Sequence, residues 1–395
     1  MRRTGLYAGG IAVTIALLLG TACERKPVGA VTPQPSQGAP APAGGREETS
    51  IPYGEAEVVA DKLNVPWDAV FAPDGRLFFT ERAGAIRVIE NGRLAADPVF
   101  AFTDKPVVSR SESGLLGLTL DPDFTGNGYM YAYHTYEANG SLKNRVLRLK
   151  LEGGKAKLDR VLLDGLPGQQ THDGGRIRFG PDGLLYITVG DAQEREQSQS
   201  MASLAGKILR IRSDGSIPAD NPDPKSPVYS LGHRNPQGLA WQPDTGRLFS
   251  SEHGQTAKDE INVIEKGGNY GWPLIEGDQT EPKQKAAGAP LRPPLLHSGA
   301  DTTWAPSGMT FITQGPWKGQ LLVANLRGMQ VLKLTLAAGT EPKVDRVEPL
   351  WKERYGRLRS VLEGPDGSLY VLTNNRDGRG TPQQDDDRIL RFRPQ

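Results

Sequence analysis

Short runs that alternate apolar with polar residues recur along the chain from residue 51 to residue 395, and they predict β-strands. One recurring unit reads apolar–x–Pro–Asp–Gly–x–Leu followed by aromatic or β-branched residues, as in FAPDGRLFFTE from Phe71 and FGPDGLLYITVGD from Phe179. Proline presets φ, Asp and Gly adopt turn geometry, and the following residues favour extended chain, so each copy predicts a hairpin. The other copies are LDPDFTGNGYMYAYHT from Leu120, WQPDTGRLFSSEHG from Trp241, EGPDGSLYVLTNN from Glu363 and a degenerate FITQGPWKGQLLVANL from Phe311.

A second unit follows each copy of the first and alternates apolar with charged residues. Alternation at period two predicts strands with one buried face. Six copies of each unit between residues 51 and 395 give a repeat of roughly 57 residues, which is long for a propeller and requires long loops. No segment longer than a turn or two predicts a helix. The copies read GAIRVIENG, NRVLRLKLEG, GKILRIRSDG, DEINVIEKGG, MQVLKLTLAAG and DRILRFRP.

Regular strand pairs without helices favour sheets arranged radially, and six repeats predict an all-β, six-bladed β-propeller with four-stranded blades over residues 51–395. A β-sandwich or a β-helix is the alternative. We expect the strand around Val58 to Val65 to join the sheet that contains Ile389 to Phe392, which closes the ring without a free edge.

The N-terminus predicts targeting rather than folded structure. Residues 1–22 combine two arginines with an apolar run from Gly9 to Leu19 that is too short to span a bilayer, and Cys23 follows. This resembles a bacterial lipoprotein signal in which Cys23 is lipidated, although Gly20 stands where leucine is usual. Cys23 is the only cysteine in the sequence, so no intrachain disulfide is possible. An ordinary secretory signal with an unrelated cysteine is the alternative.

Residues 23–50 are rich in Pro, Gly, Ala, Gln and Ser and contain almost no large apolar side chain. Such a segment cannot bury enough surface to offset its ordering entropy, so it predicts a disordered tether. We therefore expect a cell-envelope protein, either lipid-anchored or secreted, that contacts the membrane through a lipid anchor only.

Charge and motif content exclude several function classes. Forty-seven basic residues against forty-six acidic ones argue against a nucleic-acid partner. None of the five histidines forms a pair with zinc-site spacing on a helix, and no nucleophile elbow, phosphate loop or dinucleotide fingerprint is present. Polar residues gather instead after or between the predicted strands, where the loops of a propeller form its binding face.

Several of these polar segments resemble the soluble PQQ-dependent glucose and aldose sugar dehydrogenases, where PQQ is pyrroloquinoline quinone. The resemblance extends from about Val59 to the C-terminus. Its most specific parts are GHRNPQGLAW and DEINVIEKGGNYGWP, supported by SGLLGLTLDPDF and HDGGRIRFGPDG, all in family order.

The resemblance implies that His172 is the catalytic base, which takes the proton of the sugar's anomeric hydroxyl while hydride moves from C1 to the quinone. An imidazole that titrates near neutral pH suits this role. Asp191, in TVGDA, could orient the base or balance its charge. Thr171 stands before the base where the family has an aspartate, so the details of substrate binding stay open.

Cofactor binding is likewise implied by the resemblance. PQQ carries three carboxylates, and planar guanidinium groups can bind carboxylates bidentately. Glu112 stands where the glucose enzyme has a glutamine that touches the cofactor, and a carboxylate there repels PQQ unless it is protonated or paired. The matching positions for the cofactor are Glu112, Arg234, Asn235, Leu326, Arg327, Arg357 and Arg359.

Calcium is the second cofactor that the resemblance implies. The main-chain carbonyls of Gly254 and Gln255 match an active-site Ca²⁺, with Asp259 close by. Glu260 and Tyr270 match a second, structural calcium site, with a carboxylate and a main-chain carbonyl as ligands. Oxygen donors of this kind suit a hard cation.

The function that follows is oxidation of aldose sugars at C1 to the lactone, with electrons passed to an envelope quinone or cytochrome. Two alternatives stay open. The first is a non-catalytic propeller that binds carbohydrate or protein at the envelope, and Glu112 is the feature that favours it. The second is a calcium-dependent lactone hydrolase, which requires carboxylates and asparagines that converge on the metal.

Overall fold

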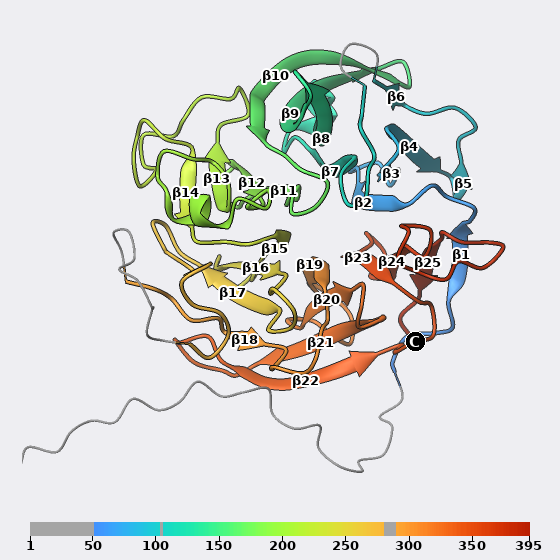
Figure 1. Ribbon diagram of the computed structural model, residues 1–395. Helices are drawn as coiled ribbons and strands as arrows, with labels where there is room; N and C mark the ends of the chain where they lie inside the picture. The colour runs from blue at the N-terminus through green and yellow to red at the C-terminus, as the bar shows by residue number, and fades with distance from the viewer. Residues whose placement is uncertain (1–50, 103–105, 280–289) are drawn as a thin grey trace, which may run out of the picture. The chain divides into compact units, whose positions relative to one another are not determined.

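The computed structural model describes residues 51–102, 106–279 and 290–395. Within these residues the strands form six antiparallel sheets arranged around a common axis (Figure 1). Each sheet is one blade of a β-propeller, so the predicted all-β, six-bladed architecture is confirmed. The predicted signal segment, residues 1–22, and the predicted tether, residues 23–50, lie outside the described residues.

In blades 1 to 5 the chain starts at the innermost strand and proceeds outward, whereas the outermost strand of blade 6, β1 (Glu57–Ala60), comes from the N-terminal end of the domain. Blade 1 contains β2 (Pro66–Phe71), β3 (Leu77–Glu81), β4 (Ala85–Glu90), β5 (Arg93–Leu94) and β6 (Phe100–Ala101). Blade 2 contains β7 (Leu115–Leu120), β8 (Tyr129–Ala138), β9 (Ser141–Glu152) and β10 (Lys155–Pro167), and blade 3 contains β11 (Ile177–Phe179), β12 (Leu185–Val189), β13 (Lys207–Ile211) and β14 (Val228–Leu231).

The second half of the ring follows the same order. Blade 4 contains β15 (Pro236–Trp241), β16 (Leu248–Glu252), β17 (Glu260–Ile264) and β18 (Leu296–His297). Blade 5 contains β19 (Pro306–Phe311), β20 (Leu321–Asn325), β21 (Gln330–Leu336) and β22 (Val344–Leu350). Blade 6 contains β23 (Leu358–Glu363), β24 (Leu369–Thr373), β25 (Ile389–Phe392) and β1 (Glu57–Ala60).

Blades 2 to 6 have the four strands that were predicted, and blade 1 has one more. Its two short strands β5 and β6 both pair with β4 and share the outer position. The helical segments in the described part of the chain are α1 (Phe124–Asn127) and the 3-10 helix η1 (Arg195–Gln199), as expected from the lack of helical patterns. Neither they nor any other described helix is long and apolar enough to cross a membrane.

The Pro–Asp–Gly units form the predicted hairpin turns between first and second strands. In three of these turns the aspartate side chain accepts the N–H two residues further on: Asp74 from Arg76, Asp182 from Leu184, and Asp366 from Ser368, at 3.0–3.2 Å. The glycine then takes a positive φ, 87° at Gly75 and 75° at Gly367, which side chains disfavour. The repeat therefore encodes the turn as well as the strands.

The ring is closed by pairing the two ends of the domain. Strand β1 pairs antiparallel with β25, with Glu57 opposite Arg391, as predicted for this segment. Ion pairs from Glu57 to Arg391 and to Arg393 reinforce the closure. The strand is shorter than predicted because Lys62 and Val65 both adopt φ of 53°, which ends the extended conformation.

The core is divided among the six interfaces between neighbouring blades, and one cluster of buried apolar side chains lies at each. Both faces of an inner strand are therefore covered by neighbouring blades, and the expectation of a single buried face is wrong for many strands. In β13 all five residues are buried, including Lys207 and Arg210. The ammonium of Lys207 is satisfied by three main-chain carbonyls at 2.6–3.0 Å.

Candidate active site

Most of the predicted site residues come from loops at one end of the blades, while Arg359 lies in β23 and Glu260 in β17. The residues at this end either precede a first strand, as His172, Arg234 and Arg357 do, or follow a second strand, as Gly254 and Leu326 do. Because these two strands are antiparallel, the start of one and the end of the other lie at the same edge of the blade. The ring therefore gathers loops that are far apart in the sequence onto one face.

These loops enclose a cavity of about 740 Å³. Asp191 and Asn235 lie behind its wall and contact residues that line it. Glu260 and Tyr270 are not among the described residues that line it. The predicted residues that the cavity brings together are Glu112, His172, Arg234, Gly254, Gln255, Asp259, Leu326, Arg327, Arg357 and Arg359.

His172 faces the cavity with its ring fixed from behind. It has a positive φ of 64°, and its side chain is 18% exposed. Its Nδ1 lies 2.7 Å from Oδ1 of the buried Asp191. A carboxylate only accepts, so Nδ1 carries the proton and Nε2 is left as an acceptor.

Asp191 is held by three donors. Besides His172 it accepts the N–H of Gln193 at 2.8 Å and the indole N–H of Trp272 at 2.8 Å. Burial raises the pKa of the Asp191 carboxyl, but the hydrogen bond and charge of His172 and the two other donors outweigh burial and hold it below its ordinary value. Asp191 is therefore ionised beside the imidazole at neutral pH.

Trp272, in the GGNYGWP motif, connects the imidazole to the cationic side of the cavity. The guanidinium of Arg234 lies 5.4 Å from the centre of a Trp272 ring, and that of Arg195 lies 4.7 Å from it. Arg234 also donates to the carbonyl of His253 at 3.3 Å, while its buried Nε has no hydrogen-bond partner. Burial lowers the pKa of Arg234, which makes an anion beside it favourable.

Positive charge exceeds negative charge on the cavity wall. Five arginines line it, against the two carboxylates of Glu112 and Asp259. Arg357 donates its Nε and Nη2 to Asp377 at 2.9 and 2.7 Å, and Arg359 donates its Nε to Asn374 at 2.8 Å and its Nη1 to Gln237 at 2.7 Å. One terminal nitrogen of each guanidinium has no partner among the described residues. The cavity is suited to a ligand with several negative charges.

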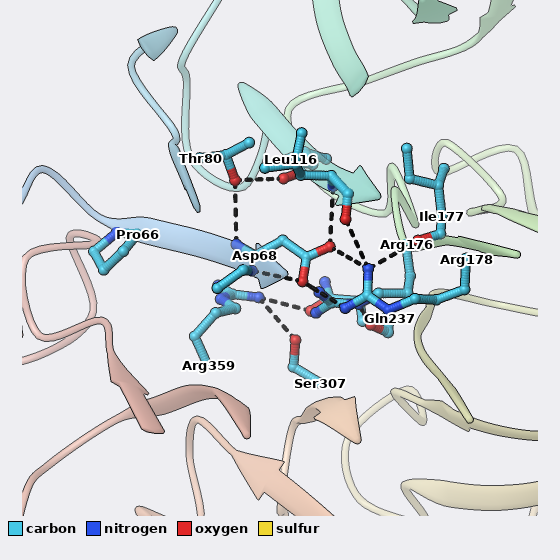
Figure 2. A network of polar contacts seen from close by, with 12 residues as sticks. Pro66, Asp68, Thr80, Leu116, Arg176, Ile177, Arg178, Gln237, Ser307 and Arg359 are labelled. Atoms are coloured by element: carbon cyan, nitrogen blue, oxygen red, sulfur yellow. Dashed lines mark hydrogen bonds and ion pairs between the residues drawn. The ribbon is translucent and has the colours of Figure 1, made fainter. Parts of the chain in front are cut away.

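A polar network among the inner strands connects the cavity residues Gln237 and Arg359 with Asp68 (Figure 2). Asp68 of β2 is fully buried and accepts both terminal nitrogens of Arg178 at 2.7 Å, with Arg176 also paired to it. Arg176 in turn donates to the carbonyl of Gln237, whose side chain accepts from Arg359. Burial lowers the pKa of Arg359 to about 9, so it is charged at pH 7 without a carboxylate hydrogen-bonded to it.

Glu112 is ionised and paired. Burial raises the pKa of its carboxyl, but His253 and Arg379 together bring it down to about 2. Its Oε1 forms an ion pair with Arg379, and its Oε2 lies 3.4 Å from the N–H of His172 and 3.5 Å from the amide nitrogen of Asn235. The sequence left open whether the Glu112 carboxyl is protonated or paired with a cation, and in the structure it is paired.

The loop after β16 contributes two of the predicted calcium ligands to the cavity wall. Gly254 and Gln255 line the cavity, and no hydrogen bond within the described residues uses their carbonyls. Asp259 braces the loop: it accepts the N–H of Gly254 at 3.0 Å and those of Trp304 and Ala305 at 2.5 and 2.9 Å. Its oxygens are thus occupied by backbone donors.

The second predicted calcium site lies in blade 4, away from the cavity wall. Glu260 is buried opposite Glu252 and accepts from Gly277 at 2.9 Å and Asn262 at 3.2 Å. Burial and then the charge of Glu252 raise the pKa of the Glu260 carboxyl to about 8. The hydroxyl of Tyr270 donates to a main-chain carbonyl at 2.6 Å, and its ring stacks on a histidine. In the described part of the chain, no group of three or more His, Cys, Asp or Glu side chains is arranged to hold a metal.

Sequence reasoning missed several residues of the cavity. His253 precedes Gly254 within a segment that was singled out, but it had no assigned role. Its Nε2 donates to the carbonyl of Pro306 at 3.0 Å, and its Nδ1 accepts from the side-chain amide of Asn235 at 3.4 Å. Burial lowers the pKa of His253 to about 4, so it is neutral at pH 7. Arg379 lies in the segment RDGRGTPQQ, which is not part of any motif that indicated a functional site.

Comparisons with known proteins agree with this architecture. The model of the family described as glucose/sorbosone dehydrogenase matches residues 63–390. Quinoprotein glucose dehydrogenase B of Acinetobacter calcoaceticus is 31% identical over 421 residues, which covers 84% of this chain and 87% of that protein. Aldose sugar dehydrogenase YliI of Escherichia coli is 32% identical over 342 residues, which covers 82% of this chain and 90% of that protein.

A solved structure gives the same result. The PQQ-bound form of the aldose sugar dehydrogenase of Streptomyces coelicolor is 36% identical and superposes with a TM-score of 0.74, over 86% of this chain and 98% of that one. The resemblance inferred from the sequence motifs is therefore confirmed, and the chain belongs to the glucose/sorbosone dehydrogenase family.

Proposed function

We propose that this protein is a PQQ- and calcium-dependent aldose dehydrogenase, which oxidises the C1 hydroxyl of an aldose to the lactone. The observation that carries the proposal is the presence of one oriented imidazole, that of His172, in the same cavity as Arg234, Arg357 and Arg359. An acid–base group beside a cluster of cations is what a sugar oxidation on a polyanionic cofactor requires.

The described residues fit a tricarboxylate. The wall has five arginines and two carboxylates, and Asp377 pairs with Arg357 from behind it, so positive charge still exceeds negative charge where the three carboxylates of PQQ would lie. The orphaned Nε of Arg234 supplies a buried donor, and Arg357 and Arg359 each have a terminal nitrogen to offer. Leu326 and Arg327 would flank the quinone, the first as an apolar contact and the second as a positive charge.

When bound, PQQ supplies the hydride acceptor for the carbon that is oxidised. His172 takes the proton of the C1 hydroxyl at Nε2, because its Nδ1 is committed to Asp191. The ionised Asp191 then stabilises the imidazolium that forms. A cavity of about 740 Å³ is within the usual size range of small-molecule sites.

Calcium is supported by the oxygen donors near the cations. The unpaired carbonyls of Gly254 and Gln255 are hard ligands at the cavity wall, and Asp259 keeps their loop in place rather than offering a free carboxylate. A divalent ion there would polarise a quinone carbonyl. A second ion would offset the buried negative charge of Glu252 and favour ionisation of Glu260, with the carbonyl of Tyr270 as the further ligand that the family resemblance implies.

The alternatives are less well supported. Glu112 was the feature that favoured a non-catalytic propeller, and its pairing with Arg379 removes that argument. A calcium-dependent lactone hydrolase would use side-chain carboxylates that converge on the ion, and the described residues contain no such group.

The cellular setting is part of the proposal. Residues 1–22 act as a lipoprotein signal, Cys23 is lipidated, and electrons pass to a quinone or cytochrome of the envelope. A Cys23→Ser variant should lose metabolic labelling with palmitate and its membrane association. Labelling of the variant equal to that of the wild type would contradict the anchor.

The activity is tested by adding PQQ and Ca²⁺ to purified apo-protein and following dye reduction with a panel of aldoses. Cofactor retention is measured separately, by absorbance after gel filtration. We expect retention and reduction with the wild type, and retention without most of the turnover for His172→Gln. Absence of both retention and reduction in the wild type would refute the proposal, and unchanged rates in the variant would remove His172 from the reaction.

A further inference from the structure

Glu112 and Arg379 form an ion pair at the rim of the cavity between elements that are distant in the sequence. Glu112 precedes β7 of blade 2, and Arg379 follows β24 of blade 6, so the pair extends past blade 1. The Glu112 side chain is 14% exposed and that of Arg379 is 49% exposed. Both line the cavity beside His172.

Arg379 is placed by the same aspartate that holds Arg357. Asp377 accepts the main-chain N–H of Arg379 at 2.9 Å through Oδ1, and the guanidinium of Arg357 through Oδ2. The loop is tightly packed, since a Cβ on Gly380 would lie 2.5 Å from the carbonyl oxygen of Asn375. Charges therefore alternate along the rim, from Arg357 through Asp377 and Arg379 to Glu112.

Glu112 needs this partner at neutral pH. The pKa of Glu112 lies far below its ordinary value, and His253 contributes to that shift only when it is protonated. Because burial keeps His253 neutral at pH 7, Arg379 is the hydrogen-bonded cation that balances the Glu112 carboxylate under working conditions. Without Arg379 the carboxylate would face the cofactor with no ion-pair partner, and only the long contacts from His172 and Asn235 would remain.

We propose that Arg379 is the counter-charge that makes a carboxylate at position 112 compatible with a polyanionic cofactor, so that the two residues act as a unit that sets cofactor affinity. This inference rests on the proposed PQQ-dependent function. It explains how the chain tolerates Glu112 where the related glucose enzyme has a neutral glutamine. Arg379 acts through Glu112, as a charge-balancing residue, and takes no part in proton transfer.

The test is a double-mutant cycle with wild type, Glu112→Gln, Arg379→Gln and the double variant. Dissociation constants for PQQ are measured in Ca²⁺ by quenching of tryptophan fluorescence, without sugar and without turnover. Loss of one partner of a charge pair that faces an anionic ligand should weaken binding roughly 10- to 100-fold in Arg379→Gln. Restoring neutrality in the double variant should return affinity to within about threefold of the wild type, because the unpaired carboxylate is gone.

A matched control removes an arginine of another exposed ion pair. Arg354→Gln breaks the pair with Glu55 outside the cavity, changes net charge equally and should leave PQQ affinity unchanged. Thermal melting of each apo-variant verifies folding. Equal affinities in wild type and Arg379→Gln, or equal weakening in Arg379→Gln and the double variant, would overturn the inference alone. Wild type that does not bind PQQ would instead refute the proposed function together with it.

Discussion

Replacing Asp191 with asparagine tests how the fold prepares His172. An asparagine at this position offers one side-chain oxygen to three donors, because His172 and Gln193 share Oδ1 and the indole N–H of Trp272 donates to Oδ2. Whichever way the amide turns, its nitrogen opposes one of these donors. In both orientations the imidazolium that forms when His172 takes the substrate proton has lost its counter-charge.

The size of the effect follows from the separation of the two groups. An imidazolium and a carboxylate 2.7 Å apart interact with about 6 kcal/mol at an effective dielectric of about 20. Because the His172 side chain is 18% exposed, we discount this to about 4 kcal/mol. At about 1.4 kcal/mol per factor of ten, Asp191→Asn should lower kcat on the order of 10³-fold.

The assay is dye reduction with saturating aldose, after reconstitution with PQQ and Ca²⁺. Cofactor retention should stay within about threefold of the wild type, since Asp191 does not line the cavity. Asp74→Asn, in the exposed turn between β2 and β3, is the matched control and should keep full kcat. A kcat for Asp191→Asn within threefold of the wild type would refute the orienting role, and lost retention with a lowered melting temperature would make Asp191 structural.

Three further predictions concern stability. Burial raises the pKa of Asp173 to about 7, and its Oδ2 has no partner, so the folded protein keeps a proton that the unfolded chain releases near pH 3.8. The free energy of unfolding should therefore fall as the pH rises between these two values. In urea denaturation, Asp173→Asn should be more stable than the wild type by up to about 4 kcal/mol at pH 8, but not at pH 4. Lys207→Met leaves three buried main-chain carbonyls without their hydrogen-bond donor, and it should lower the free energy of unfolding by about 2–4 kcal/mol in the same assay. A loss of less than about 0.5 kcal/mol would show that water satisfies these carbonyls. Deletion of residues 1–50 should leave the melting temperature unchanged, whereas deletion of residues 1–62 removes β1, exposes the edge of β25 and should cause aggregation detectable by light scattering.

The hairpins and the closure of the ring could be read from the sequence because both depend on local chemistry. The Pro–Asp–Gly turns carry their own side-chain acceptors, as at Asp74 and Asp366, and the alternating units carry the third strands. The outer strands were not seen as separate units. They vary from two residues in β18 to thirteen in β10, and they have one solvent-facing edge that imposes no repeating pattern.

The motifs also named most of the cavity wall, since His172, Arg234 and Arg357 stand in segments with a recognisable order of residues. Arg379 could not be found in this way. Its relation to Glu112 spans 267 positions and exists only because blades 2 and 6 present their loops on the same face of the ring. Charge pairs of this kind follow from the closed geometry and not from a local pattern.

The sequence by itself determined the strands, the turns and the identity of the groups available for chemistry, because these depend on neighbours within a few residues. Only the tertiary structure decided what each group faces. It put Asp191 behind His172, gave Arg359 a buried position without a carboxylate bound to it, and supplied Glu112 with a cation. The physical reason is that desolvation and Coulomb interactions act through space, so the charge state of a side chain is set by residues that the closed ring brings beside it.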